Sequence, residues 1–218
     1  MEKSTKQMKK WKGDFGYHYT DRNTFTVSEQ DKVYMKEFGI PATKLFKSVV
    51  GKLDKDIRIL EIGSNSGNML RLFRALGFKN VYGIEINKYA VETCRTKTKD
   101  VNIIEGSALD VPFKDGYFDL VFTAGVLIHI SPKDIKKVIS EIYRCSNRYI
   151  LGIEFFADSY REVNYRGNKD LLWKTDFRKL YLDTFKGLSG VSAKKIQYQD
   201  SDKENMIFLL EKKKGKKA

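Results

Sequence analysis

Between residues 57 and 156, short apolar runs alternate with amphipathic stretches, and this alternation admits few folds. The runs are rich in β-branched residues, as strands buried on both faces of a parallel sheet should be. The stretches between them carry apolar residues at helical spacing. Strand–helix alternation predicts right-handed βαβ crossovers and therefore a parallel sheet. The expected strands are residues 57–62, 81–86, 101–106, 118–124 and 149–156.

The flanking segments complete the expected fold. Residues 29–53 have the pattern of two helices interrupted at Gly39, and Ser131, which proline follows, suits the N-cap of a later helix. Residues 191–199 and 206–213 are typical of a closing antiparallel hairpin. We therefore predict an α/β fold of the doubly wound kind, with a mostly parallel seven-stranded sheet and an antiparallel terminal hairpin.

The length of 218 residues suits a single domain, and much of the net charge of +13 lies at the two ends. Residues 1–12 and 211–218 each carry five lysines against one glutamate. Such runs are more typical of solvated, frayed ends than of nucleic-acid-binding arms, although both interpretations stay open. We expect a basic arm or lid at 1–28, one domain at 29–213 with a substrate-side insertion at 154–190, and a basic tail at 214–218.

The composition argues against several classes of protein. No window holds the run of about 18 uncharged apolar residues that a membrane-spanning helix needs. The N-terminus lacks the apolar stretch of a signal peptide. Cys94 and Cys145 form no CxxC pattern and only two histidines exist, so neither a disulfide framework nor a metal site is expected. We expect a cytoplasmic protein without a metal.

The exit of the first expected strand is the expected ligand site, because sheets of this class bind ligands beyond the carboxyl ends of their strands. Residues 61–67 read EIGSNSG, and glycines there permit a tight turn and close approach of a ligand. Glu85 lies 22 residues after Gly63, where a carboxylate can accept hydrogen bonds from both ribose hydroxyls. Asn65 stands where the nicotinamide-binding fingerprint requires glycine, which favours a nucleoside ligand without a pyrophosphate.

Three stretches resemble the motifs of class I S-adenosylmethionine-dependent methyltransferases, in that family's order: ILEIGSNSGNML, GIEIN and EGSALDVPFKDGYFDLVFTAGVLIHI. The resemblance covers roughly residues 57–155 and implies S-adenosylmethionine as cofactor. Many members of the family carry aspartate where this chain has Ser107, so Ser107 would meet the adenine without a charge. Within this stretch we expect cofactor binding by Glu61, Gly63, Ser64, Asn65, Gly67, Glu85, Ile86, Ser107, Ala108, Ala124 and Gly125, with Tyr19 and Arg22 added from the N-terminal segment.

The flanks resemble a narrower subgroup. WKGDFGYHYTDRN at 11–23 and YRGNKDLLWKTDF at 165–177 are similar to the signatures of the pseudaminic acid biosynthesis-associated methylases. This resemblance implies a sugar or nucleotide-sugar acceptor. It also favours an N-terminal lid formed by Tyr17, Tyr19 and Arg22, with the arginine facing the carboxylate of the cofactor. Packing of an aromatic arm against the sheet edge is the alternative.

The acceptor site is expected beyond the fourth and fifth strands. His129 follows the fourth strand and is either a general base or a packed, catalytically silent histidine. Aromatic faces suit sugar rings and arginine forks suit phosphates or carboxylates, so a small anionic acceptor is expected to contact Tyr17, Glu154, Tyr165 and Arg166. An RNA (tRNA) methyltransferase that uses the basic ends, and a non-catalytic module that only holds the cofactor, are the alternative functions.

Overall fold

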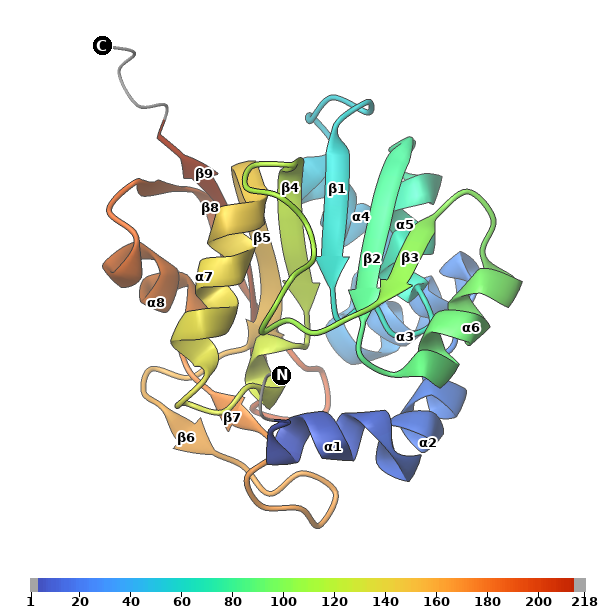
Figure 1. Cartoon of the computed structure of the whole chain (residues 1–218), viewed down its shortest axis with the longest axis vertical. Coiled ribbons are helices and arrows are strands. Elements are labelled where there is room, and N and C mark those ends of the chain that lie inside the picture. Colours follow the sequence, from blue (N-terminus) through green and yellow to red (C-terminus); the bar gives the residue numbers. More distant parts are fainter. Residues whose placement is uncertain (1–3, 214–218) are drawn as a thin grey trace.

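The predicted seven-stranded sheet is present, in the order β3-β2-β1-β4-β5-β9-β8 (Figure 1). The structure is a computed structural model and describes residues 4–213. The first five strands run parallel, and β9 is antiparallel to both β5 and β8. The bounds are Arg58–Ile62 (β1), Asn80–Glu85 (β2), Asn102–Glu105 (β3), Phe118–Ala124 (β4), Ser146–Phe155 (β5), Leu188–Gln197 (β8) and Glu204–Lys212 (β9).

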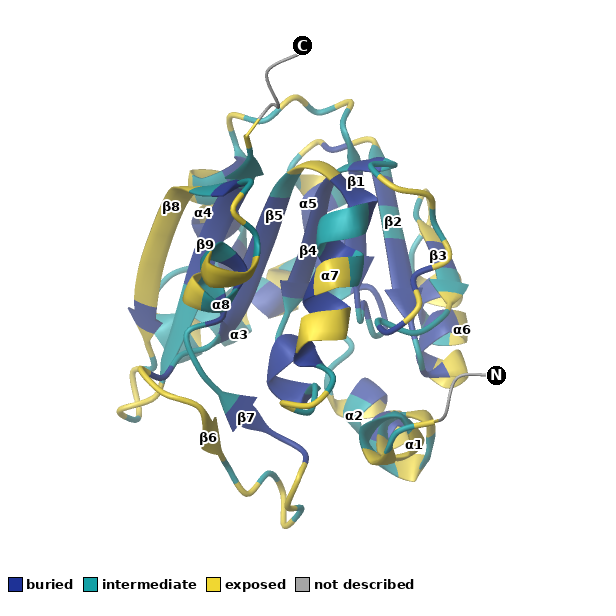
Figure 2. Ribbon diagram, turned by 60° about the vertical axis from the view of Figure 1, so that its left-hand side comes forward, coloured by how far each residue is buried: buried dark blue, intermediate teal, exposed yellow. Residues whose placement is uncertain are grey.

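Helices cover both faces of the sheet, and each face has its own apolar core (Figure 2). On one face, Phe46 and Phe73 pack against the sheet, and the Phe73 ring stacks on Phe122 of β4 at 4.6 Å. On the other face, Val138 and Ile142 pack against the same sheet. The helices of the first face are α3 (Val27–Phe38), α4 (Ala42–Val50), α5 (Asn68–Ala75) and α6 (Lys88–Lys97), and those of the second are α7 (Ile135–Cys145) and α8 (Phe177–Thr184).

Local sequence signals set several helix ends. Thr26 and Glu29 form a reciprocal capping box at the start of α3, and Gly39 ends that helix in the left-handed conformation. Asn87 caps α6, because its side chain accepts hydrogen bonds from two backbone amides of the first turn. The prediction that Ser131 is the N-cap of the next helix was wrong. Residues 132–134 form a turn, and α7 begins at Ile135 with Asp134 as its N-cap.

The N-terminal segment crosses the carboxyl ends of the strands (Figure 1). Its helices are α1 (Lys6–Lys12) and α2 (Asp14–Arg22), so the interpretation of residues 1–12 as a frayed end was wrong from Lys6 onward. Lys6 and Gln7 of α1 both bond Asp170, in the segment between the short strands β6 (Arg161–Glu162) and β7 (Trp173–Lys174). Residues 1–3 and the predicted tail at 214–218 lie outside the described residues. Within residues 4–213, each helix is too short or too polar to cross a bilayer.

Candidate active site

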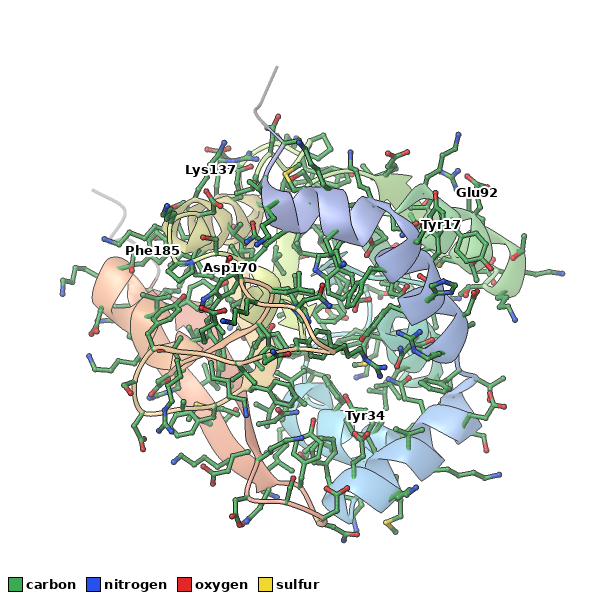
Figure 3. The ribbon with its side chains drawn as sticks, turned by 90° about the horizontal axis from the view of Figure 1, so that it is seen from below. Tyr17, Tyr34, Glu92, Lys137, Asp170 and Phe185 are labelled. Carbon is green, nitrogen blue, oxygen red and sulfur yellow. The ribbon has the colours of Figure 1, made fainter. Side chains whose placement is uncertain are left out.

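A cavity of about 460 Å³ lies at the carboxyl ends of the central strands, under α1 and α2. Figure 3 views this end, with α1 and α2 on one side and α3, which carries Tyr34, on another. The sequence-predicted residues that line the cavity are Tyr19, Glu61, Gly63, Ser64, Asn65, Glu85, Ile86, Ser107, Ala108, Ala124, Gly125, His129, Glu154, Tyr165 and Arg166.

The turn after β1 bends back through three left-handed residues. Gly63, Asn65 and Gly67 have φ values of 71°, 47° and 80°. Asparagine adopts this conformation more readily than other residues with a side chain, which explains how Asn65 replaces a glycine here. The backbone amides of Gly63 and Ser64 donate to the Ile84 carbonyl oxygen of β2 and fix the turn to the sheet.

Gly67 does not line the cavity. It is the N-cap of α5, and a Cβ atom there would lie 2.4 Å from the Cys94 sulfur. The need for glycine at this position therefore comes from the packing of the turn against α6. Its predicted contact with the cofactor stays a prediction.

The Glu85 carboxylate, at the end of β2, is buried and fixed by backbone amides. It is 8% exposed and accepts hydrogen bonds at 2.8 Å from the backbone amides of Asn65 and Asn87. Burial raises its pKa, and the backbone amide bonds act in the opposite direction. A carboxylate has about four acceptor positions, so these amides do not use all of them and a ligand hydroxyl can also donate to Glu85.

Two buried oxygen atoms beside Glu85 have no protein partner. They are Oε2 of Glu61 and Oγ of Ser64, and both residues line the cavity. Burial, with the neighbouring Glu85 carboxylate, raises the pKa of Glu61 well above its usual range. Buried polar atoms are normally hydrogen-bonded, so their lack of partners indicates a ligand with polar groups.

The space for a sulfonium nucleoside is present. Gly125 follows β4 with a φ of 67°, and a Cβ atom there would meet nothing within 4 Å, so this backbone borders open space. Ser107, at the expected adenine edge, lines the same cavity, and its Oγ accepts from the Leu109 amide at 3.1 Å. Together with Glu85 and the unpaired Glu61 oxygen, these residues fit S-adenosylmethionine.

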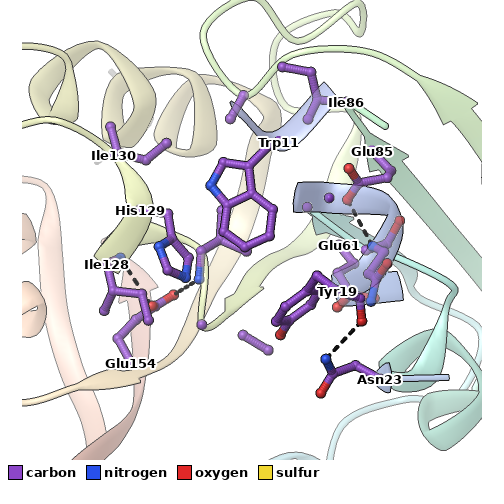
Figure 4. Close-up of a pocket in the computed structure, with 18 of the residues that line it drawn as sticks. Trp11, Tyr19, Asn23, Glu61, Glu85, Ile86, Ile128, His129, Ile130 and Glu154 are labelled. Atoms are coloured by element: carbon purple, nitrogen blue, oxygen red, sulfur yellow. Dashed lines mark hydrogen bonds between the residues drawn. The ribbon is translucent and has the colours of Figure 1, made fainter. Parts of the chain in front are cut away.

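His129 lies in the wall on the other side of the cavity (Figure 4). Its Nδ1 is 2.6 Å from the Leu171 carbonyl oxygen, and the ring lies 4.7 Å from Trp11 and 5.2 Å from Tyr165. Burial lowers its pKa to about 4, so the ring is neutral at pH 7. A carbonyl oxygen only accepts, so Nδ1 carries the proton and Nε2 retains its lone pair.

Glu154 holds the loop that leads to His129. It is 2% exposed, and its carboxylate accepts from the backbone amides of Val126 at 3.1 Å and Ile128 at 3.4 Å (Figure 4). Burial raises its pKa to about 7. The structure thus gives Glu154 backbone partners in this loop and a side-chain hydrogen bond with Thr123, and its predicted contact with substrate stays a prediction.

Tyr165 and Arg166 lie in a tight turn between β6 and β7. Backbone bonds at 3.0 Å join Tyr165 and Asn168 in both directions, and Arg166 has a φ of 51°. Both Tyr165 and Arg166 line the cavity on the side of His129. The structure thus brings the predicted acceptor contacts Tyr165 and Arg166 together with His129 in one cavity wall.

The N-terminal helices cover the cavity, but only one of their three predicted lid residues lines it. Tyr19 lines the cavity, but Tyr17 and Arg22 are exposed outside the lining, and the Tyr17 ring packs 5.4 Å from Tyr89. Trp11, which sequence reasoning missed, lines the cavity, and its carbonyl oxygen accepts from the Asn87 side chain at 2.8 Å. The sequence could have indicated this, because a tryptophan within a lysine-rich segment is unusual for a solvated chain end.

The fold is the seven-stranded, mostly parallel sheet of the class I S-adenosylmethionine-dependent methyltransferases. Residues 60–148 match a family described as "Methyltransferase domain", so the chain carries this domain and its cofactor is S-adenosylmethionine.

Individual relatives are distant. A sterol methyltransferase-like protein of Botryococcus braunii is 24% identical over 62% of this chain and 33% of its own length. The ribosomal protein L11 methyltransferase of Aquifex aeolicus is 28% identical over 61% of this chain and 51% of its own length. The chain thus spans about a third to a half of these relatives. A Burkholderia thailandensis 1,6-didemethyltoxoflavin-N1-methyltransferase superposes with a TM-score of 0.72 at 14% identity, over 98% of this chain and 92% of that one.

Proposed function

We propose that this chain transfers a methyl group from S-adenosylmethionine to a small-molecule acceptor. The observation that carries the proposal is that a single cavity extends from the turn at residues 61–67 and Glu85 to the wall formed by His129, Tyr165 and Arg166. When bound, the cofactor supplies a methyl group already activated on a sulfonium. The chain's own task is therefore to position the acceptor and to exclude water.

His129 is the proposed general base. The bond between its Nδ1 and Leu171 fixes the ring and leaves Nε2 free to take a proton from a hydroxyl or an amine. Because its pKa is about 4, the ring is neutral throughout the neutral range and Nε2 keeps its lone pair, although burial also makes the ring a weaker base than an exposed histidine. Glu154 is a positioning residue, since it holds the backbone of the loop that leads to His129.

The acceptor is proposed to be a sugar or nucleotide-sugar. Tyr165 offers an aromatic face to a sugar ring, and Arg166 offers a fork to a phosphate or carboxylate. Relatives and structural neighbours act, by their names, on sterols, a ribosomal protein and a heterocyclic nitrogen, so they favour no single acceptor. Because α1 and α2 cover the cavity, we favour a small acceptor over the alternative of an RNA substrate. The two buried free cysteines favour a reducing compartment such as the cytoplasm.

The test is a transfer assay with S-adenosylmethionine labelled in its methyl group. The full chain is incubated with the small-molecule, RNA and protein fractions of a cell extract. Label is expected in the small-molecule fraction, and His129→Gln should lower kcat while affinity for S-adenosylhomocysteine stays within about twofold. Label found in the RNA fraction alone would show that the chain is an RNA methyltransferase and would overturn the proposal of a small-molecule acceptor. Binding of S-adenosylhomocysteine without transfer to any fraction would favour a non-catalytic module.

A further inference from the structure

The cavity continues beyond the turn at residues 61–67, which we call the cofactor turn, into a second region, which we call the aromatic lobe. It lies between α3 and the turn that joins β8 to β9, a turn tied to α3 by the bond from the Gln199 amide to the Glu37 carbonyl oxygen at 2.7 Å. The lobe is lined by Tyr34, Glu37, Phe38, Phe155 and Tyr198.

The four rings of the lobe form one continuous wall. The Phe38 ring lies 5.2 Å from Tyr34 and 4.5 Å from Tyr198, and Tyr198 lies 5.8 Å from Phe155. Adjacent rings meet edge to face or tilted, so several ring faces are available at different angles. Faces arranged in this way are attractive to a cation because each presents the negative part of its quadrupole.

Besides the hydroxyl groups of Tyr34 and Tyr198, which can also donate, the polar groups of the lobe include several hydrogen-bond acceptors. Within residues 4–213, Glu37 forms no ion pair, and burial together with Asp200 raises the pKa of its carboxyl group. Gln30 is 5% exposed and donates its amide nitrogen to the Met69 sulfur, which leaves its Oε1 buried without a partner. Oδ1 of Asn205 is also buried without a partner. A ligand group that donates hydrogen bonds would satisfy these atoms.

The charge of the whole cavity has the sign opposite to that of the chain. Although the net charge is +13, the lining holds one arginine, Arg166, and five acidic residues: Glu37, Glu61, Glu85, Asp134 and Glu154. Burial raises the pKa of Glu61 and Glu154, so the negative charge of the lining rests mainly on the other three. Lysines are absent from the lining within the described part of the chain; Lys174, whose Nζ lies 4.8 Å from the Phe155 ring, stays outside it. Glu61 and Glu85 face the cofactor turn, which leaves Glu37 for another ligand.

We infer that the aromatic lobe binds an amino or ammonium group of the methyl acceptor. Glu37 supplies the countercharge, the rings of Tyr34, Phe38 and Tyr198 supply cation–π contacts, and Gln30 and Asn205 accept the N–H groups. An anionic group would be repelled by Glu37 and would leave these oxygens unsatisfied, so any anionic part of the acceptor belongs at Arg166. This inference rests on the proposed function and narrows its substrate class to amine-bearing molecules.

The test compares three probes that share a ring and differ in charge: benzylamine, benzyl alcohol and benzoate. Each is titrated by ligand-observed NMR into the full chain saturated with S-adenosylhomocysteine at pH 7.5. Benzylamine is expected to bind at least about fivefold more tightly than benzyl alcohol, the ratio that one cation–π or ion-pair contact gives. Benzoate is expected to bind most weakly of the three.

Variants locate the binding. Glu37→Gln should remove the preference for benzylamine while leaving benzyl alcohol within about twofold, and Tyr198→Leu should weaken benzylamine with the carboxylate intact. Glu92→Gln, which changes an exposed carboxylate of α6, is the matched control and should leave all three probes unchanged.

Equal binding of benzylamine and benzoate, or a benzylamine preference that survives Glu37→Gln, would overturn the inference. Affinity for S-adenosylhomocysteine is measured alongside in each variant and should stay within about twofold. If the wild-type chain fails to bind that nucleoside, the proposed function fails as well. Normal nucleoside binding without an amine preference defeats the lobe inference alone.

Discussion

The Thr20 hydroxyl group of α2 donates to the side-chain carbonyl oxygen of Asn65 at 2.7 Å. One partner lies in the helix that covers the cavity, and the other lies in the cofactor turn. Asn65 in turn donates its backbone amide to Glu85. The covering helix α2 and the Glu85 carboxylate are therefore connected through a single residue, Asn65, whose backbone is left-handed.

Thr20→Val should weaken cofactor binding with little change in fold. Valine keeps the shape of this buried side chain but removes the hydroxyl, which leaves the Asn65 oxygen without its partner. The loss of one such bond costs about 1 kcal/mol, or about fivefold in affinity for S-adenosylhomocysteine by calorimetry. An affinity unchanged from wild type would show that the contact between α2 and the turn does not support the cofactor site.

Gly125→Ala should affect the cofactor more than the fold. The added methyl group meets no protein atom within 4 Å and projects into open space, although a φ of 67° makes alanine strained by about 1 kcal/mol. We expect a modest fall in melting temperature and at least about tenfold weaker binding of S-adenosylhomocysteine. Gly167→Ala is the matched control, because that glycine has a φ of 75° and is equally open. Similar losses of nucleoside affinity in both variants would contradict the placement of the sulfonium.

Glu154 should make stability depend on pH. Its pKa is about 7 in the folded chain against an ordinary value of 4.5, so the native state keeps a proton that the unfolded state releases. This contribution to stability is fully present below about pH 4.5 and is lost as pH rises through 7. Its size is on the order of 1–3 kcal/mol.

Glu154→Gln tests this dependence. Melting temperatures of the variant and the wild type are compared between pH 5 and 8. As pH rises, the melting temperature of the wild type should fall relative to that of the glutamine variant, because glutamine has no proton to lose. A pH-independent difference would show that Glu154 does not titrate in this range.

Much of the cofactor half of the site could be predicted from the sequence, because its residues follow strand ends that hydrophobic patterning locates. The turn 61–67, Glu85 and Gly125 are of this kind. The lid was harder. Residues 14–22 form a helix with Gly16, Tyr19 and Thr20 toward the protein and Tyr17 outward, and without that helical phase the inward residues could not be chosen.

The aromatic lobe was not predictable from one sequence. Tyr34 and Phe38 read as the apolar stripe of an ordinary amphipathic helix, and Tyr198 and Asn205 read as parts of a hairpin. These segments lie more than 150 residues apart, and tertiary packing alone brings them to one cavity. Glu37 is likewise an ordinary polar helix residue until the fold places it beside those rings.

Arg166→Ala should change acceptor kinetics and leave the cofactor alone. Arg166 lines the cavity from the turn between β6 and β7. We expect a higher KM or a lower kcat/KM for the acceptor found in the transfer assay, with affinity for S-adenosylhomocysteine within about twofold. Unaltered kinetics together with a lower melting temperature would mean that this segment is structural and that the acceptor lies elsewhere.

The central claim, that the turn 61–67 and Glu85 form a site for S-adenosylmethionine, is tested most directly by calorimetric titration of the full chain with S-adenosylhomocysteine and with NAD. The first should bind with one-to-one stoichiometry and the second should not bind. Glu85→Ala should weaken the nucleoside by about 1.5–3 kcal/mol, the range for hydrogen bonds to a charged group. Its loss of two backbone partners makes a melting curve of the variant a necessary control. Binding of NAD without S-adenosylhomocysteine, or equal nucleoside affinity in folded Glu85→Ala, would contradict the claim.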